Sequence, residues 1–122
     1  TLQAGTVLIA PNNAHLTVQS NRIVLEDSPP KNNCRPAVDV LFHSLADQGL
    51  AAETVALLLT GMGTDGAAGM DALKKQGAYT IAQDEASSAI FGMPKAAIER
   101  GAATEVLPLE HIAEVVRRLF TR

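Results

Sequence analysis

Val55-Ala56-Leu57-Leu58-Leu59 is an unbroken apolar run that leads into the turn Thr60-Gly61-Met62-Gly63-Thr64-Asp65-Gly66. A continuous run of this kind is typical of a parallel strand that is covered on both faces. After the turn, Met70 and Leu73 fall on one side of a helix predicted over 66–76, and charged side chains fall on the other. A strand, a glycine-rich turn and a helix in this order predict an α/β domain with its functional residues in the turn.

The same alternation extends over most of the chain. Helical periodicity, with proline near the start and glycine at the end, predicts helices over 36–49, 66–76, 94–100 and 109–120. Apolar runs between them predict strands over 55–59, 78–83 and 105–107. Alternating helices and strands favour a parallel sheet with right-handed crossovers. We therefore expect one α/β domain over residues 1–122, with alternating units over 36–121.

The first 26 residues follow a different pattern. Residues 6–10 are predicted to form a strand, which Pro11-Asn12-Asn13 ends. Residues 15–19 and 23–25 are predicted to pair as an antiparallel hairpin within 5–26, with the turn between them. The polar loop over 26–33 is too short to separate two domains. The chain begins without Met, which we interpret as a processed or truncated product.

Composition excludes several classes of function. The net charge is −3 and the 10 Lys and Arg are scattered, so we expect no nucleic-acid partner. No apolar run approaches the ~20 residues that a membrane helix needs, so we expect no membrane insertion. Cys34 is the only cysteine, so no disulfide is possible within the chain and a cytoplasmic protein is expected. The three histidines and Cys34 lack zinc-site spacing, and we expect no metal or other cofactor.

Gly61-x-Gly63-x-x-Gly66 also matches the dinucleotide-binding fingerprint, with Asp84 about twenty residues later. Asp65 argues against this interpretation, because it lies where a pyrophosphate would meet the helix N-terminus. Two like charges about 4 Å apart cost roughly 4 kcal/mol at an effective dielectric constant of about 20. Three roles for Asp65 therefore remain open: a helix cap, a carboxylate that orients an imidazole as in Ser-His-Asp hydrolysis, and, with least support, part of a nucleotide site.

Several longer motifs resemble one family. The segments 59–66 (LTGMGTDG), 80–88 (TIAQDEASS) and 92–97 (GMPKAA) closely resemble the catalytic domain of the chemotaxis protein-glutamate methylesterase. The segments 5–11 with His15 and Leu16, 35–39 (RPAVD) and 106–109 (VLPL) match the same family. The resemblance covers essentially the whole chain, with its motifs in the family's order.

The resemblance implies a doubly wound α/β fold, with a mostly parallel sheet and an antiparallel hairpin. It implies hydrolysis of glutamate methyl esters on methyl-accepting chemoreceptors, and deamidation of glutamines, by a Ser-His-Asp triad under control of a receiver domain that this chain lacks. Asp65 matches the triad Asp, and Met62 matches the residue whose backbone N–H helps form the oxyanion hole. His15 lies in the matched hairpin and is a candidate for substrate binding, with a structural role as the alternative.

The sequence departs from the family at the other two triad positions. The family's Ser, in a Gly-x-Ser-Thr-Gly-Gly turn, and its His, in a Gln-His-Met stretch, do not occur here. Ser87 and Ser88 follow an acidic pair rather than occupying a glycine-flanked turn, so neither is expected to replace the nucleophile.

We therefore interpret the chain as the C-terminal portion of one catalytic domain, inactive alone, with only Asp65 of the triad. The alternative is a non-catalytic module that binds a receptor or another partner. In either case we expect a preceding segment, a second chain or an oligomer to cover the exposed edge of strand 55–59.

Overall fold

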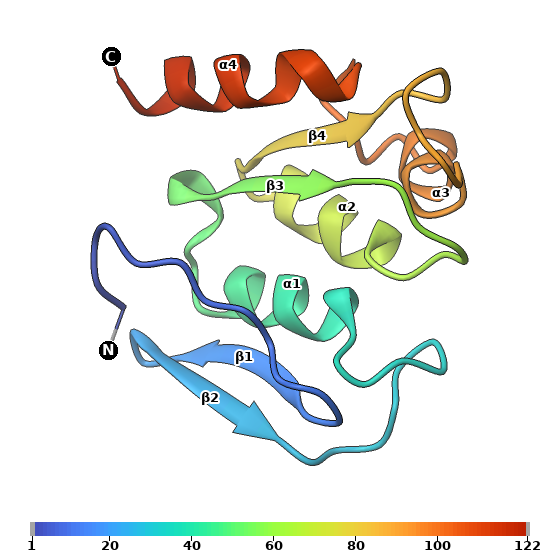
Figure 1. Ribbon diagram of the computed structural model, residues 1–122. Coiled ribbons are helices and arrows are strands. Elements are labelled where there is room, and N and C mark those ends of the chain that lie inside the picture. The colour runs from blue at the N-terminus through green and yellow to red at the C-terminus, as the bar shows by residue number, and fades with distance from the viewer. Residues whose placement is uncertain (1, 122) are drawn as a thin grey trace.

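The strands predicted after residue 50 lie side by side and parallel in the computed structural model, which describes residues 2–121. β3 (Val55–Leu58) pairs with β4 (Tyr79–Gln83), and β4 pairs with β5 (Glu105–Leu107), so the strand order is β3-β4-β5. Figure 1 shows the carboxyl ends of β3 and β4 at the same edge of the sheet, as parallel pairing requires. This confirms the predicted parallel α/β sheet.

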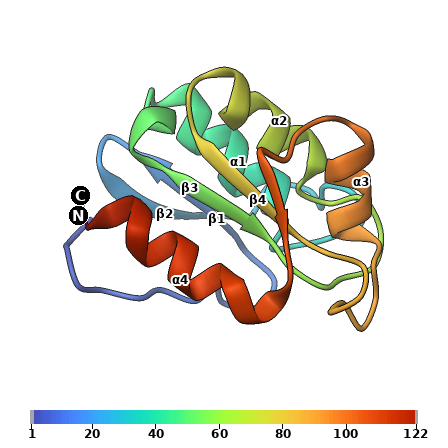
Figure 2. The same ribbon diagram turned by 90° about the horizontal axis from the view of Figure 1, so that it is seen from above.

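The helices lie on both sides of this sheet. α1 (Val38–Asp47) and α2 (Ala67–Lys75) lie on one side, and α4 (Leu109–Phe120) lies on the other (Figure 1). α3 (Met93–Glu99) packs against α2 and β4. Figure 2 shows the same arrangement from above, with α4 separated from α1 and α2 by the sheet. The layering agrees with the doubly wound fold that the resemblance implied.

The predicted hairpin forms from β1 (His15–Gln19) and β2 (Arg22–Glu26), which pair antiparallel. Ser20 and Asn21 form its two-residue turn with φ values of 50° and 62°, the left-handed conformation that tight hairpin turns require. The hairpin packs against the outer side of α1, and the Val18 N–H donates to Ser44 Oγ at 3.0 Å.

The strand predicted over 6–10 is not formed, and this prediction is wrong. Residues 6–10 carry no strand assignment, and Val7 and Ile9 are each 89% exposed. A strand needs a neighbour to satisfy its backbone N–H and C=O groups, and no strand among residues 2–121 pairs with this segment. Its apolar residues favour a strand, but the described chain offers no neighbouring strand for it to pair with.

Strand β3 also differs from the prediction of a strand covered on both faces. It lies at the edge of the described sheet, with one unpaired side. Ala56 and Leu58 are buried, whereas Val55 and Leu57 are half-buried. The described chain therefore leaves part of this apolar run exposed, which agrees with the expectation that one edge of the strand is uncovered.

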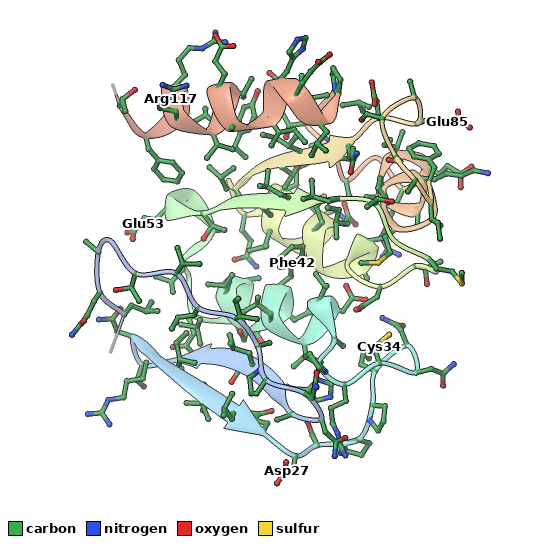
Figure 3. The ribbon with its side chains drawn as sticks, viewed as in Figure 1. Asp27, Cys34, Phe42, Glu53, Glu85 and Arg117 are labelled. Atoms are coloured by element: carbon green, nitrogen blue, oxygen red, sulfur yellow. The ribbon has the colours of Figure 1, made fainter. Side chains whose placement is uncertain are left out.

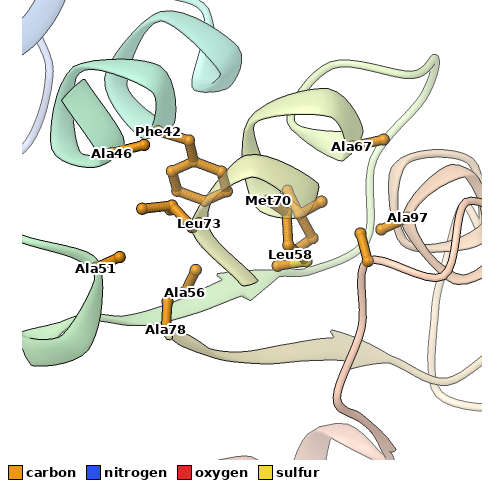
Figure 4. Close-up of a cluster of buried hydrophobic side chains, with 11 residues drawn as sticks. Phe42, Ala46, Ala51, Ala56, Leu58, Ala67, Met70, Leu73, Ala78 and Ala97 are labelled. Carbon is orange, nitrogen blue, oxygen red and sulfur yellow. The ribbon is translucent and has the colours of Figure 1, made fainter. Parts of the chain in front are cut away.

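The core lies between α1, α2 and the sheet. Phe42 of α1 points into it, as Figure 3 shows, and meets Leu73 and Met70 of α2 (Figure 4). Met70 and Leu73 are 0% exposed, so the predicted inner face of this helix is confirmed. The remaining core side chains are mostly alanines, which lets the helices and the sheet approach closely. No helix in the described part of the chain is long and apolar enough to cross a membrane.

Helices α1 and α2 touch at Gly69. A Cβ atom at Gly69 would lie 2.6 Å from Phe42 Cβ and 3.0 Å from Asp39 Oδ1. Both distances are shorter than van der Waals contact, and the first involves an atom fixed to a helix backbone. The glycine therefore sets how closely the two helix N-termini approach.

We expect Gly69→Ala to lower the free energy of unfolding by about 1–2 kcal/mol, because overpacking outweighs the better helix propensity of alanine. Urea unfolding measures this, and Lys75→Ala, at an exposed site on the same helix, should change stability by less than about 0.5 kcal/mol. A Gly69→Ala variant as stable as the parent would contradict the close contact.

Candidate active site

The glycine-rich turn over 60–66 lies at the carboxyl edge of the sheet, directly after β3. The loop over 84–91, which follows β4, lies at the same edge, and a bridge between Gly61 and Phe91 joins the two loops. Ligand sites of parallel α/β sheets form at this edge, since the loops that follow neighbouring strands meet there. The two predicted catalytic residues, Asp65 and Met62, belong to this turn, whereas His15, the predicted binding residue, lies in the hairpin.

Asp65 is 6% exposed, and its carboxylate accepts three hydrogen bonds. Oδ2 accepts from the Val38 N–H at 2.7 Å, and Oδ1 accepts from the Asp39 N–H at 3.1 Å and from Asn32 Nδ2 at 3.0 Å. Val38 and Asp39 are the first two residues of α1, so Asp65 caps that helix. Capping was one of the roles left open, but the capped helix is α1 rather than α2, the helix that follows the turn.

Asp39 makes the reciprocal contact. Its side chain is 2% exposed, and its Oδ1 accepts from the Gly69 N–H at 2.7 Å, within the first turn of α2. Each helix thus receives at its N-terminus a carboxylate from the segment that carries the other. Unpaired N–H groups and the positive end of the helix dipole both favour negative charge at these positions. The two carboxylates therefore hold α1 and α2 together at one end.

The Asp65 carboxylate keeps room for one further donor. An ionised carboxylate offers about four acceptor positions, and three are used here. Oδ1 accepts two of these bonds and Oδ2 accepts one. Oδ2 therefore retains one unused acceptor position, and the orienting role requires such a position for an imidazole N–H.

The Met62 turn is fixed through its two preceding residues. The Gly61 N–H donates to Ile90 O at 2.9 Å, and Gly61 O accepts from the N–H groups of Gly92 and Met93 at 2.9 and 2.8 Å. Thr60 Oγ1 donates to Ile90 O at 3.1 Å and accepts from the Ile90 N–H at 2.8 Å. These bonds fix the start of the turn against the 90–93 segment.

Gln83 adds a buried side-chain contact to the start of the same turn. Its side chain is 1% exposed, its Oε1 accepts from the Thr60 N–H at 2.7 Å, and its Nε2 donates to Ser87 O at 2.8 Å. One amide therefore joins the ends of β3 and β4 to the loop over 84–88.

Met62 itself projects outward, with 77% of the residue exposed. Among residues 2–121, its backbone N–H has no hydrogen-bond acceptor, whereas the two preceding residues, Thr60 and Gly61, are held by hydrogen bonds. A Cβ atom at Gly92 would lie 2.7 Å from Gly61 O and 3.1 Å from Met62 Cα, so only glycine permits this approach. A free N–H on a fixed loop is the arrangement that an oxyanion hole uses.

His15 is fully buried, and both of its ring nitrogens bond to backbone groups. The Ala37 N–H donates to Nδ1 at 3.2 Å, and Nε2 therefore carries the proton and donates to Pro29 O at 3.0 Å. These bonds join the hairpin to the loop before α1.

The remaining candidates lie apart from these groups. Ser87 Oγ donates to Asp84 Oδ1 at 2.6 Å and accepts from the Leu109 N–H at 3.0 Å, which fixes the start of α4. Cys34 lies in the loop before α1 (Figure 3), where its thiol contacts Asn32 O at 3.4 Å. Within residues 2–121, no three His, Cys, Asp or Glu side chains lie together as a metal site would require.

Comparison with known proteins decides the family. A family model described as CheB methylesterase matches residues 1–116. This chain belongs to the CheB methylesterase family. It is 50% identical over 121 residues to "Protein-glutamate methylesterase/protein-glutamine glutaminase 2" of Burkholderia pseudomallei (strain 1710b), which covers 98% of this chain and 35% of the relative. It is 51% identical over 118 residues to the corresponding protein 1 of Anaeromyxobacter dehalogenans (strain 2CP-C), covering 94% and 34%.

The fold comparison agrees. The crystal structure of the Thermotoga maritima CheB methylesterase catalytic domain superposes with a TM-score of 0.83 at 39% identity, covering 90% of this chain and 60% of that one. The resemblance drawn from the sequence is thereby confirmed for the family and the fold. The chain spans about a third of the length of its curated CheB relatives.

The sequence gives no sign of the role of three residues that hold the α1–α2 junction and the Met62 turn together. Asp39 was visible as an acid in the first turn of a helix, a position where acids stabilise their own helix, but its bond is to the neighbouring one. Asn32 lay in a segment interpreted only as a loop, although an Asn-Asn pair indicates left-handed backbone. Gln83 ended a predicted strand without any sign of its contact to Thr60.

We expect Asp65→Ala and Asp39→Ala each to lower the free energy of unfolding by about 2 kcal/mol, because each leaves buried helix N–H groups without acceptors. The double variant should cost less than the sum, since both residues hold the same junction. Urea unfolding measures these values. Asp47→Ala, at the exposed C-terminal end of α1, is the matched control and should not lower the free energy of unfolding. An equal loss in that variant would refute the reciprocal capping of α1 and α2 by Asp65 and Asp39.

Proposed function

We propose that this chain supplies the acid and part of the oxyanion hole of a protein-glutamate methylesterase that also deamidates glutamine. The observation that carries the proposal is the Asp65 carboxylate, fixed by three N–H donors at the carboxyl edge of the sheet with one acceptor position left on Oδ2. Family membership supports the reaction class, since the CheB relatives are named for both activities.

In the proposed mechanism, a serine hydroxyl attacks the carbonyl carbon of a glutamate methyl ester, and a histidine accepts the hydroxyl proton. Asp65 orients the imidazole and stabilises the positive charge that forms on it. The Met62 N–H donates to the oxyanion of the tetrahedral intermediate. The imidazolium returns the proton to the departing methoxide, and methanol leaves. Water then hydrolyses the acyl-enzyme to glutamate; with a glutamine substrate the first product is ammonia.

The serine and the histidine belong, in this proposal, to a segment outside the 122 residues. Two features support its location. Strand β3 has an unpaired edge next to the Met62 turn, and the apolar segment over 6–10 exposes Val7 and Ile9. Further strands on the β3 edge would pair its backbone groups and end beside Asp65, since parallel neighbours share a carboxyl edge. Residues 1–122 then form the C-terminal portion of one catalytic domain.

The proposal extends to the setting of the reaction. Methyl-accepting chemoreceptors are the proposed substrates, in the cytoplasm, and a phosphorylatable receiver domain of a two-component pathway is the proposed regulator. The two backbone bonds of His15 favour a structural role over substrate binding, since they occupy both ring nitrogens.

We expect Asp65→Asn in the complete methylesterase to lower kcat by about 10⁴-fold, because the amide cannot hold the imidazole in the required tautomer. Methanol release from methylated receptor measures kcat. Circular dichroism at the assay temperature should show a folded protein, although the lost acceptor costs about 1–3 kcal/mol of stability.

Two controls sharpen this test. Asp47→Asn, on the exposed end of α1, should keep normal turnover. The 122-residue chain alone should release no methanol, since it lacks the nucleophile. Near-normal turnover of Asp65→Asn would refute the proposed acid, and a complete protein that binds receptor without any turnover would instead favour the non-catalytic binding module.

A further inference from the structure

We propose that Asn32 is a positioning residue for the hydrolysis, acting through Asp65 by directing which carboxylate oxygen receives the imidazole. The inference rests on the proposed function of Asp65 and extends it to a residue in a different loop. Its basis is one side-chain amide shared between two buried carboxylates.

The Asn32 Nδ2 atom donates to Asp65 Oδ1 at 3.0 Å and to Asp39 Oδ2 at 2.8 Å. An asparagine amide has two N–H bonds, so each carboxylate receives one. Asp39 and Asp65 are 2% and 6% exposed, so the amide joins two acids that have little contact with water. No other side chain among residues 2–121 donates a hydrogen bond to both.

This bridge has a specific effect on Asp65. With Asn32 present, Oδ1 accepts two hydrogen bonds and Oδ2 accepts one, from the Val38 N–H. Oδ2 is therefore the oxygen with an acceptor position to spare. Without the amide, each oxygen keeps one backbone donor, and the two oxygens no longer differ in what they can accept. Asn32 thus selects Oδ2 as the partner of the imidazole and fixes the plane of the carboxylate.

The backbone supports the same role. Asn32 has a φ of 54°, in the left-handed region that asparagine tolerates better than most residues. This conformation directs the side chain from the 31–34 turn towards the junction of α1 and α2. Asn33 has a similar φ of 62°, but its side chain makes no hydrogen bond among the described residues. The pair therefore provides a test residue and a matched control at neighbouring positions.

The test uses glycine, which keeps the left-handed backbone and removes only the side chain. In the complete methylesterase, Asn32→Gly should lower kcat by about 10-fold to 100-fold with KM nearly unchanged, because a misdirected carboxylate impairs proton transfer rather than substrate binding. Asn33→Gly should leave both constants within about 2-fold. Equal kcat values for the Asn32→Gly and Asn33→Gly variants would overturn the inference.

A double-mutant cycle separates positioning from general structural support. If Asn32 acts through Asp65, adding Asn32→Gly to Asp65→Asn should lower kcat by less than about 2-fold further. The same fold loss in both backgrounds would overturn the inference. The cycle also separates this inference from the proposed function: if Asp65→Asn alone keeps normal turnover, the proposed function fails, whereas a large loss there with no loss in Asn32→Gly refutes only the role of Asn32.

A second measurement needs no change at Asn32 and so does not depend on the folding of that variant. In the complete protein, the Asn32 Nδ2 proton resonances should move when Asp65→Asn is introduced, and those of Asn33 should not. Asn32 resonances that stay unchanged would contradict the shared amide.

Discussion

The N-termini of α1 and α2 are each capped by a carboxylate from the segment that carries the other helix, and the rest of the structure depends on this reciprocal capping. Asp65 accepts from the first two N–H groups of α1, and Asp39 accepts from Gly69 in the first turn of α2. Each helix lacks a capping side chain of its own, so neither N-terminus is satisfied without the other. This reciprocal capping requires the two helices to touch, which Gly69 permits. The core of Phe42, Met70 and Leu73 packs next to this contact.

The same junction of α1 and α2 fixes the position of Asp65, the proposed acidic residue of the triad. A carboxylate that caps a helix is already fixed in orientation and surrounded by donors, so it needs little reorganisation to hold an imidazole. The Met62 turn is fixed independently, through Gly61, Gly92 and the buried amide of Gln83. Asp65 and Met62, the proposed acid and oxyanion donor, are thus held by two separate sets of contacts on one short turn, at an edge where β3 has an unpaired side.

Much of this could be predicted from the sequence, because the strongest signals are local. The apolar run before Gly61, the helical spacing of Met70 and Leu73, and the hairpin turn each depend on neighbouring residues. The strand, the inner helix face and the hairpin were confirmed, although the strand is only partly covered. The wrong predictions concern contacts between residues that lie far apart in the sequence. Residues 6–10 have the composition of a strand but no partner, and Asp65 caps α1 rather than the helix that follows it. Residues far apart in sequence, such as Asn32 and Asp65, give no periodic signal of their contact.

In the proposed enzyme, the Asp65 carboxylate both caps α1 and orients the catalytic imidazole. The most direct measurement is a crystal structure of the complete catalytic domain. We expect an imidazole nitrogen within about 2.6–3.2 Å of Asp65 Oδ2, with the bonds from Val38, Asp39 and Asn32 retained. A structure in which the imidazole contacts another acid, or in which Asp65 must leave α1 to reach it, would refute this double role of Asp65.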